Sequence, residues 1–392
     1  MRNAKSFWLI LVMISTASSA FADGPPDGWH YLTPQGVNKN PLFSEFKYFN
    51  FQAPGISGAM TYSVFAPGLL KTLQLNGYFY IDGKLVTVHR AYPLDGVRAQ
   101  ANQLKANFGG PEDGVVSRTA NPGEMKIHVF EHTGQIQWDL MFTAPMAEVT
   151  SEVTEIPLGY QPRLAPLLRV QNMNWSPVFR SGLVEGTVTF SETGRVVPVR
   201  TTTIYHDENW ENWIPQYQPF NWMHFTALDS AKERVDLMLV EFPNSTTTAA
   251  GLTIYSQGTK KNWPPGSYNV SIKKTGFIPI TRHLGATAEQ MQQIDVDPTF
   301  ARSESATRQI PIEYEIKTDD DQVAAHMRVV AALSSTTTRA RPAGSPPPKL
   351  AILDGVLVEE QVLDVSVRFL SHDGKARQAA GRGEYMNTAN EP

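Results

Sequence analysis

Hydrophobic and polar residues alternate along most of this chain, which is the pattern of half-buried β-strands. Residues 73–79 put apolar side chains and a glycine on one face and mainly polar side chains on the other. Asp82 and Gly83 then lead into a second apolar segment at 85–88, which predicts a tight β-hairpin. The same pattern, with turn residues between the segments, recurs at 125–130, 136–142, 184–199, 235–239, 252–254, 310–316, 327–333 and 363–369.

Helical patterns are few in this sequence. Residues 98–108 end at a Gly-Gly pair, and residues 287–294 begin with Thr287 as a plausible N-cap, so these two segments are the predicted helices. Many short strands separated by turns predict an all-β sandwich or barrel. Because 392 residues exceed one ordinary domain, we expect two such β units.

The first residues have the features of a secretory leader. Arg2 and Lys5 precede an apolar core at 7–14, which is too short to span a bilayer, and a small-x-small cleavage site follows at 20–22. We therefore expect residues 1–22 to be a signal peptide and the protein to be periplasmic or secreted. No later segment has the length and apolarity of a transmembrane helix, so we expect no integral membrane segment after cleavage.

Composition excludes several kinds of chemistry. The chain has no cysteine, which rules out disulfides, thiolate nucleophiles, cysteine-type zinc sites and iron–sulfur clusters. The formal net charge is −4 with both signs spread along the chain, so no basic stripe predicts nucleic-acid binding. We find no nucleophile elbow, phosphate loop or dinucleotide fingerprint. We expect no cofactor and no nucleic-acid partner.

The densest group of reactive side chains lies at 205–213, where carboxylates, an imidazole and two indoles occur within nine residues. Buried acids and amides are costly unless they are paired, so such a cluster indicates either a site or a solvated turn. The cluster contains no Gly or Pro, and residues 201–204 before it read as a strand. Further aromatic residues follow as far as Trp222. These features favour a site.

Asp207 is the candidate acid in this cluster. If Asp207 is buried among Trp210, Trp213 and Trp222, its charged form is disfavoured and its pKa rises. A neutral carboxylic acid in an apolar pocket can protonate even a carbon–carbon double bond, and indole faces can stabilise the resulting cation. The alternative is a structural aspartate that caps backbone amides between two domains.

The pleat of a strand separates neighbouring side chains. Tyr205 and Asp207 are expected on one face and His206 on the other, so a direct His–Asp dyad is not expected. A metal site built from His206, Glu208 and Glu211 lacks a second histidine at ligand spacing. We therefore expect no metal.

The sequence Tyr-His-Asp-Glu-Asn-Trp at 205–210 resembles the signature Tyr-His-Asp-His-Asn-Trp-Gly of the carotenoid 1,2-hydratases, also called hydroxyneurosporene synthases, the AttH-domain family. A Gly-x-x-x-Gly-x-Val hairpin precedes it, as in the family. Glu208 and Glu211 stand where the family has His and Gly. The likeness extends, less specifically, to three further segments at 45–49, 137–142 and 381–386.

This resemblance implies two tandem lipocalin-like (calycin) β-barrel domains, at 24–215 and 216–392, with the signature near their junction. It implies that Asp207 is the proton donor and that Tyr205 assists it. Trp175 is the nearest counterpart of an upstream His-x-Trp element of the hydratases. Closed barrels would enclose apolar cavities, and the inward faces would include Leu73, Leu75, Phe79, Trp138, Leu140 and Phe142.

The sequence thus predicts a secreted protein that acts on an apolar, isoprenoid- or lipid-like small molecule. The reaction would be a cofactor-independent, acid-catalysed hydration, isomerisation or cyclisation of a double bond, with Asp207 and Tyr205 as catalytic residues. One alternative is a non-catalytic periplasmic carrier of a hydrophobic ligand, and another is a carbohydrate-binding or carbohydrate-processing β-protein. The candidate ligand-binding residues are Trp138, Trp175, Trp210, Trp213 and Trp222.

Overall fold

The computed structural model describes residues 30, 32–33, 36–37, 43–65, 72–93, 115–120, 123–132, 134–150, 153–160, 170–212, 220–242, 251–284, 302–336 and 356–390. The predicted leader at 1–22, both predicted helices and Trp213 lie outside the described residues, so these predictions stay open. No helix within the described ranges has the length and apolarity needed to cross a membrane.

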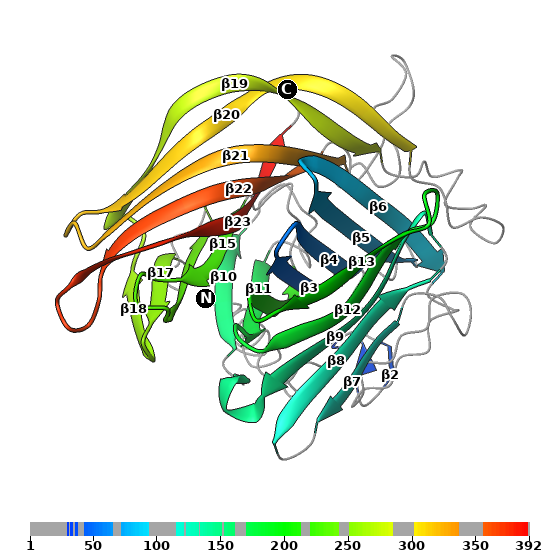
Figure 1. Cartoon of the computed structure of the whole chain (residues 1–392), viewed down its shortest axis with the longest axis horizontal. Coiled ribbons are helices and arrows are strands. Elements are labelled where there is room, and N and C mark those ends of the chain that lie inside the picture. Colours follow the sequence, from blue (N-terminus) through cyan, green and yellow to red (C-terminus); the bar gives the residue numbers. More distant parts are fainter. Residues whose placement is uncertain are drawn as a thin grey trace, which may run out of the picture.

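A seven-stranded antiparallel sheet carries the 205–210 motif, in the order β10-β11-β14-β3-β4-β5-β6 (Figure 1). The predicted hairpin forms β5 and β6, with positive φ at Asp82 (51°) and Gly83 (76°). Positive φ at both central residues is what a type I′ turn requires. The strands are β3 (Phe43–Ala53), β4 (Ile56–Phe65), β5 (Thr72–Ile81), β6 (Lys84–Pro93), β10 (Thr154–Tyr160), β11 (Val170–Phe179) and β14 (Ile204–Asn212).

A five-stranded sheet encloses the first hydrophobic core together with the seven-stranded one. Its order is β13-β12-β9-β8-β7, and alternate residues of β8 and β9 are buried. Of the predicted inward residues, all but Leu73, whose side chain is not described, lie in this core. The remaining elements of this half are β1 (Leu32–Thr33), β2 (Gly36–Val37), β7 (Val115–Ala120), β8 (Glu124–Glu131), β9 (Ile136–Pro145), the 3-10 turn η3 (Met146–Glu148), β12 (Leu183–Phe190) and β13 (Arg195–Thr201).

The second half forms one nine-stranded sheet in the order β18-β17-β16-β15-β23-β22-β21-β19-β20. Its long strands β19 to β22 arch over their own core (Figure 1). The all-β, lipocalin-like prediction is therefore confirmed. The strands are β15 (Asn221–Leu228), β16 (Arg234–Glu241), β17 (Gly251–Ser256), β18 (Thr259–Trp263), β19 (Tyr268–Leu284), β20 (Arg302–Thr318), β21 (Val323–Thr336), β22 (Val356–Leu370) and β23 (Ala376–Asn390).

A third buried cluster, which we call the junction layer, lies where the seven-stranded and nine-stranded sheets face each other. The predicted boundary at 215/216 falls within 213–219, outside the described residues, and stays a prediction. The layer is apolar and aromatic, and it positions the outer face of β14 against the second half. Its members are Tyr48, Ala59, Tyr78, Ile156, Met173, Tyr205, Trp222, Met238, Val240, Phe242, Ala331, Leu333 and Val362.

The segment before the motif differs from its prediction as a continuous strand. Strand β13 ends at Thr201, the chain bends, and β14 begins at Ile204. The Thr201 hydroxyl accepts a hydrogen bond from the Thr203 amide (3.1 Å) and donates one to the Gln52 carbonyl (2.7 Å). A threonine side chain that takes over backbone hydrogen bonds competes with strand pairing, which explains the bend.

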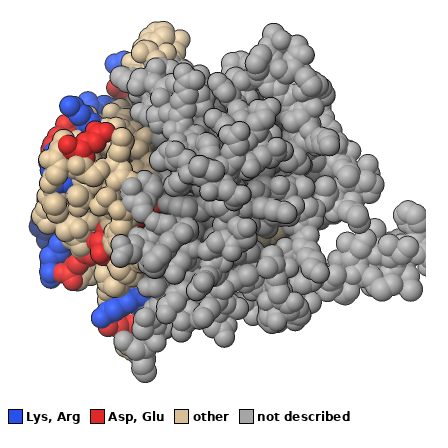
Figure 2. Space-filling model, turned by 90° about the vertical axis from the view of Figure 1, so that its right-hand side faces the viewer, with Lys and Arg blue, Asp and Glu red and all other residues tan. Residues whose placement is uncertain are grey.

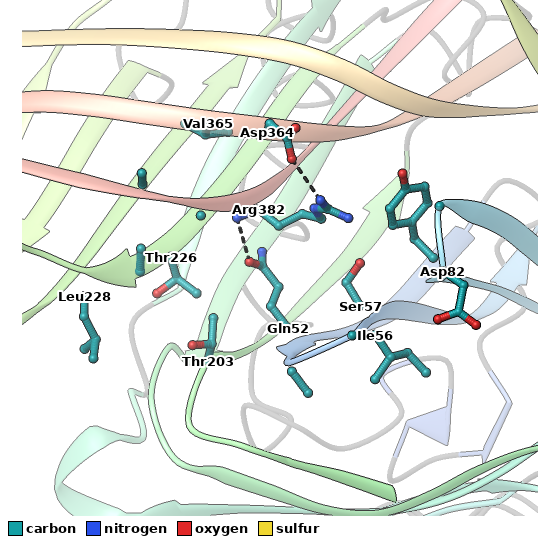
Figure 3. A pocket seen from close by; sticks show the side chains of 17 residues that line it. Gln52, Ile56, Ser57, Asp82, Thr203, Thr226, Leu228, Asp364, Val365 and Arg382 are labelled. Carbon is teal, nitrogen blue, oxygen red and sulfur yellow. Dashed lines mark hydrogen bonds and ion pairs between the residues drawn. The ribbon is translucent and has the colours of Figure 1, made fainter. Parts of the chain in front are cut away.

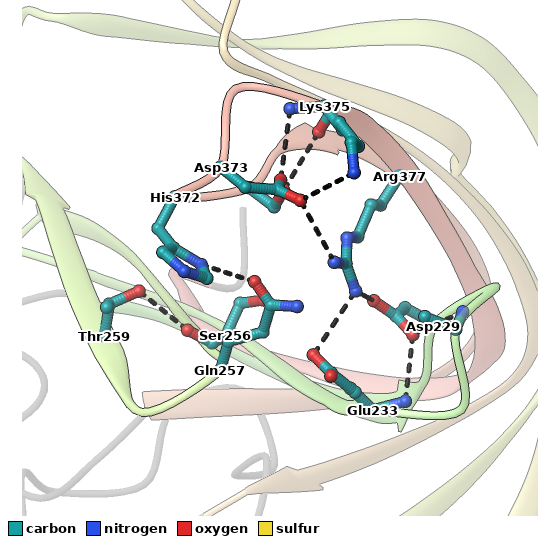
Figure 4. Close-up of polar contacts among 11 residues, drawn as sticks. Asp229, Glu233, Ser256, Gln257, Thr259, His372, Asp373, Lys375 and Arg377 are labelled. Carbon is teal, nitrogen blue, oxygen red and sulfur yellow. Dashed lines mark hydrogen bonds and ion pairs between the residues drawn. The ribbon is translucent and has the colours of Figure 1, made fainter.

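Charged side chains of both signs lie on the surface of the described chain. On the described part of the face in Figure 2, basic and acidic residues are interspersed. At one end of the nine-stranded sheet, Arg377 donates to Asp229 (3.0 Å) and Glu233 (3.3 Å) and lies 3.6 Å from Asp373 (Figure 4). This arginine joins the β15–β16 turn to the β22–β23 turn.

Candidate functional site

Strand β14 lies between β11 and β3 and presents different chemistry on its two faces. Tyr205 belongs to the junction layer, and its hydroxyl donates to Asp207 on the same side. His206 points the other way and stacks on Phe49 of the first core, with ring centroids 4.0 Å apart. The structure therefore agrees with the pleat argument, and no His206–Asp207 dyad forms.

Asp207 is 2% exposed and bonded through both carboxyl oxygens. Its Oδ2 accepts hydrogen bonds from Trp175 Nε1 (3.0 Å) and Tyr205 Oη (2.8 Å), and Asn209 Nδ2 lies 3.4 Å from Oδ1. Among the described residues, Asp207 has no arginine partner and accepts no backbone N–H bond. The carboxyl group therefore lacks the contacts that would make it a capping residue.

Burial raises the pKa of Asp207 to about 7, although the hydrogen bonds from Trp175 and Tyr205 act in the opposite direction. The negative charge of Glu208 adds to the rise. Because Oδ2 already accepts two hydrogen bonds, the neutral acid carries its proton on Oδ1. At neutral pH a substantial fraction of Asp207 is thus a proton donor.

Aromatic rings surround this carboxyl group. The Trp222 ring lies 5.1 Å from Tyr48, edge-on, and 6.0 Å from Tyr205, measured between centroids. Trp222 Nε1 is buried without a hydrogen-bond partner among the described residues, and so is Tyr78 Oη. Buried donors without partners are uncommon in folded proteins and often belong to ligand sites.

A polar group from the second half, absent from the sequence prediction, completes the site. The His224 ring stacks on Tyr205 with centroids 4.0 Å apart. Asn50 Nδ2 lies 3.4 Å from His224 Nδ1 and donates to Glu384 Oε2 (3.2 Å). Burial lowers the pKa of His224 well below its usual value and raises that of Glu384 well above it. Burial thus favours the neutral form of both groups.

The five predicted tryptophans do not form one pocket. Trp175 donates a hydrogen bond to Asp207, and the ring of Trp222 lies 6.0 Å from that of Tyr205. Trp213 is outside the described residues, and the ligand-binding role of all three tryptophans stays a prediction. Trp210 stacks on His30 in the first half, at 3.9 Å, so the expectation that it flanks Asp207 is wrong. The reason is the pleat, because residues three apart on a strand point to opposite faces. Trp138 is also remote, in the first core, where Nε1 donates to Tyr62 Oη (3.3 Å).

The opposite face of β14 carries a buried charged cluster. Lys47 Nζ lies 3.0 Å from Glu45 Oε1 and 2.5 Å from Glu208 Oε2. His30 and His206 lie 3.7 and 3.6 Å from the Glu208 carboxylate. Burial alone would raise the pKa of Glu208, but Lys47 and the two histidines hold it at about 2. Glu208, which replaces the family histidine, is thus an ion-pair partner of Lys47.

Metal binding finds no support in the described part of the chain. No group of three or more His, Asp or Glu residues there has the geometry to hold an ion. The side chain of Glu211 is outside the described residues, so the set of His206, Glu208 and Glu211 considered above is not tested.

A pocket of about 860 Å³ opens at one end of the junction, between the turns of the first half and strands β15, β22 and β23 (Figure 3). Neither Asp207 nor Tyr205 is among its described lining residues, so a common cavity for these two residues stays a prediction. Three lining residues of the pocket lie two positions along their strands, roughly 7 Å, from the group formed by Asn50, His224 and Glu384. Gln52 is two residues from Asn50, Thr226 is two from His224, and Arg382 is two from Glu384.

Tyr205→Phe is expected to raise the pKa of Asp207 above about 7, because the lost hydrogen bond favours the charged carboxylate. Carbon-13 NMR titration of labelled aspartate measures this shift. Tyr268→Phe is the matched control, since it removes a phenol that donates to Glu241 (2.8 Å) in the second half. An unchanged or lower Asp207 pKa in Tyr205→Phe would show that Tyr205 does not act on the carboxylate.

Comparison with known proteins supports the fold. No family model matches the sequence, and a search of curated proteins found no match. Among solved structures, CghA aligns over 94% of this chain and 96% of its own, with a TM-score of 0.51 and 11% identity.

Two further solved structures align over most of the chain. An AttH-like protein from Nitrosomonas europaea covers 94% of this chain and 98% of its own, with a TM-score of 0.49 and 11% identity. Kievitone hydratase from Nectria haematococca covers 89% of both chains, with a TM-score of 0.47 and 10% identity. At the level of fold, this chain shares the architecture of CghA, which agrees with the lipocalin-like fold that the resemblance at 205–210 implies.

Proposed function

We propose that this protein is a cofactor-independent enzyme that transfers a proton from Asp207 to a carbon–carbon double bond of an apolar substrate. The observation that carries the proposal is a buried carboxyl group with a pKa of about 7 beside an apolar, aromatic layer. A carboxylic acid kept neutral by its surroundings is the form that can donate a proton at physiological pH.

The first step moves one proton and one electron pair. The proton on Asp207 Oδ1 adds to one alkene carbon, and the π electron pair becomes the new C–H bond. A carbocation remains on the other carbon and a carboxylate remains on Asp207. Trp175 and Tyr205 stabilise this carboxylate through their hydrogen bonds to Oδ2.

The fate of the cation decides the product. Addition of water and loss of one proton gives hydration, loss of a neighbouring C–H proton gives isomerisation, and attack by a second double bond followed by proton loss gives cyclisation. In each case the released proton restores Asp207. The indole of Trp222 is placed to stabilise positive charge near Tyr205 through its π face.

The two alternatives differ in what they require of these residues. A carrier needs an apolar ligand site but no proton donor, so it would tolerate Asp207→Asn. A carbohydrate-binding protein presents flat, exposed indoles, whereas four of the described tryptophans are at most 9% exposed, namely Trp138, Trp210, Trp222 and Trp263. The geometry therefore favours an apolar ligand over a sugar.

Deuterium uptake tests the proposal directly. Purified protein is incubated in D₂O with geraniol, squalene and lycopene as probes, and mass spectrometry measures deuterium bound to carbon. We expect uptake into at least one probe with the wild type, and at least a hundredfold slower uptake with Asp207→Asn. The matched control is Asp319→Asn, in an exposed turn. A probe that binds tightly but acquires no deuterium would favour the carrier.

A further inference from the structure

The pocket at the end of the junction contains an arginine with spare hydrogen-bonding capacity. Arg382 Nη2 donates to Asp364 Oδ1 (2.9 Å), and its backbone amide donates to the Gln52 side chain (3.1 Å). The guanidinium lies 4.6 Å from the centroid of the Tyr80 ring. A guanidinium has five N–H donors, and no second acceptor contacts it among the described residues. Arg382 is thus held in place with donors left for a ligand (Figure 3).

A buried hydroxyl in the same pocket, that of Ser57, lacks a hydrogen-bond partner among the described residues. Ser57 is 5% exposed. It lines the pocket and pairs in register with Tyr80, over which Arg382 lies. A buried hydroxyl without a partner costs free energy unless a ligand or water satisfies it. Ser57 and Arg382 therefore both offer donors beside the Tyr80 ring.

The charges around the pocket favour an anion. Asp364 is shared between Arg382 and Arg328, whose Nη2 lies 3.1 Å from Oδ2. Asp82 is paired with Arg195. Arg328 and Arg195 are exposed and lie outside the pocket lining, where they compensate the two aspartates; with them counted, three arginines meet two aspartates and one positive charge remains. A single excess charge suits a monoanion better than a doubly charged phosphate.

One large apolar side chain is open to the pocket. Leu228 lines the pocket and is 55% exposed, whereas Ile56 and Val365 also line it but belong to the two hydrophobic cores and are 2% and 3% exposed. An exposed leucine beside a cavity offers contact area for a hydrocarbon, which is stabilised by the apolar surface it buries. The pocket volume of about 860 Å³ is in the range of small-molecule sites.

We propose that this pocket is a binding site for an apolar organic acid, whose carboxylate bonds to Arg382 and Ser57 while its hydrocarbon body packs against Leu228. Planar, two-pronged recognition by a guanidinium matches a carboxylate, and the serine hydroxyl supplies a further donor. The site is separate from Asp207 and does not depend on proton transfer there.

Fluorescence titration with cis-parinaric acid and its methyl ester tests this site on the full chain. The wild type is expected to bind the acid about tenfold more tightly than the ester, since the ester lacks the negative charge that strengthens hydrogen bonds from a guanidinium. Arg382→Met is expected to remove this preference, because it weakens binding of the acid more than binding of the ester. Arg368→Met, on the same sheet outside the pocket, is the matched control.

Two variants that introduce opposite charges at Leu228 keep the test decisive if Arg382→Met folds poorly. Both variants remove apolar contact from acid and ester alike, so the ratio of the two affinities is the readout. Leu228→Glu is expected to lower the acid-to-ester preference severalfold and Leu228→Lys to raise it. Circular dichroism checks that each variant is folded. Absence of saturable acid binding, equal affinity for acid and ester, or indifference to both Leu228 variants would each overturn the proposal. Failure here leaves the deuterium experiment at Asp207 unaffected.

Discussion

Asp207→Asn is expected to make the protein more stable than the wild type at pH 8, by up to about 4 kcal/mol, and equally stable near pH 3. Burial raises the pKa of Asp207 from 3.8 to about 7. The folded protein therefore holds a proton that the unfolded chain has released, and stability falls as the pH rises from about 4 to 7. Asparagine is neutral at every pH and lacks this penalty.

Urea denaturation at pH 3 and pH 8 measures the difference, with Asp319→Asn as the exposed control. Other buried acids, such as Glu384, are present in both proteins, so their contributions to the pH dependence cancel in the difference between the two stabilities. The asparagine variant also loses the proton that we propose it donates, so greater stability would accompany lost turnover. A stability difference that is the same at both pH values would show that the pKa of Asp207 is ordinary, and the proposed acid would then be wrong.

Lys47→Met is expected to destabilise the protein by about 3–5 kcal/mol, because it leaves the carboxylates of Glu45 and Glu208 buried without their ammonium partner. The double variant Lys47→Met with Glu208→Gln should recover much of this loss, since it removes a buried charge of each sign. Chemical denaturation of the single and double variants gives the coupling free energy.

The pH dependence gives a second measurement of this cluster. Because the pKa of Glu208 lies near 2 in the folded protein, its stabilising contribution is complete above about pH 4.5 and is lost as the pH falls toward 2. In Lys47→Met, the stability should change less as the pH falls from about 4.5 to 2. A loss below 1 kcal/mol, with the acid limb intact, would mean that the pair contributes little to folding.

Local pattern was enough to predict much of the fold. The alternation around Trp138 and Phe142 identified buried faces correctly, and the Asp82-Gly83 pair located a hairpin turn. The pleat also placed Tyr205 with Asp207 and apart from His206. These features depend only on neighbours in sequence, because side-chain direction in a strand has a period of two.

The rest of the site depends on topology. His224 and Glu384 reach Asn50 from 174 and 334 residues away, through strands of the other sheet, and no spacing in the sequence brings them together. The expectation that Trp210 lies beside Asp207 takes the aromatic density of the sequence as a sign of one pocket. The alternation of side chains along a strand instead puts the two residues on opposite faces. Lys47 was likewise not recognised as the partner of Glu208, since this requires the pairing of β14 with β3.

The two faces of β14 also limit how this protein can change over evolution. Deleting His206, or inserting one residue beside it, would reverse the faces of the following residues relative to Tyr205. The carboxyl group of Asp207 would then enter the ionic cluster around Lys47, and Glu208 would face the aromatic layer. Substitutions can tune each chemistry separately, but a change of length in this strand disrupts both at once. Length variation among descendants should therefore accumulate at exposed turns such as 82–83.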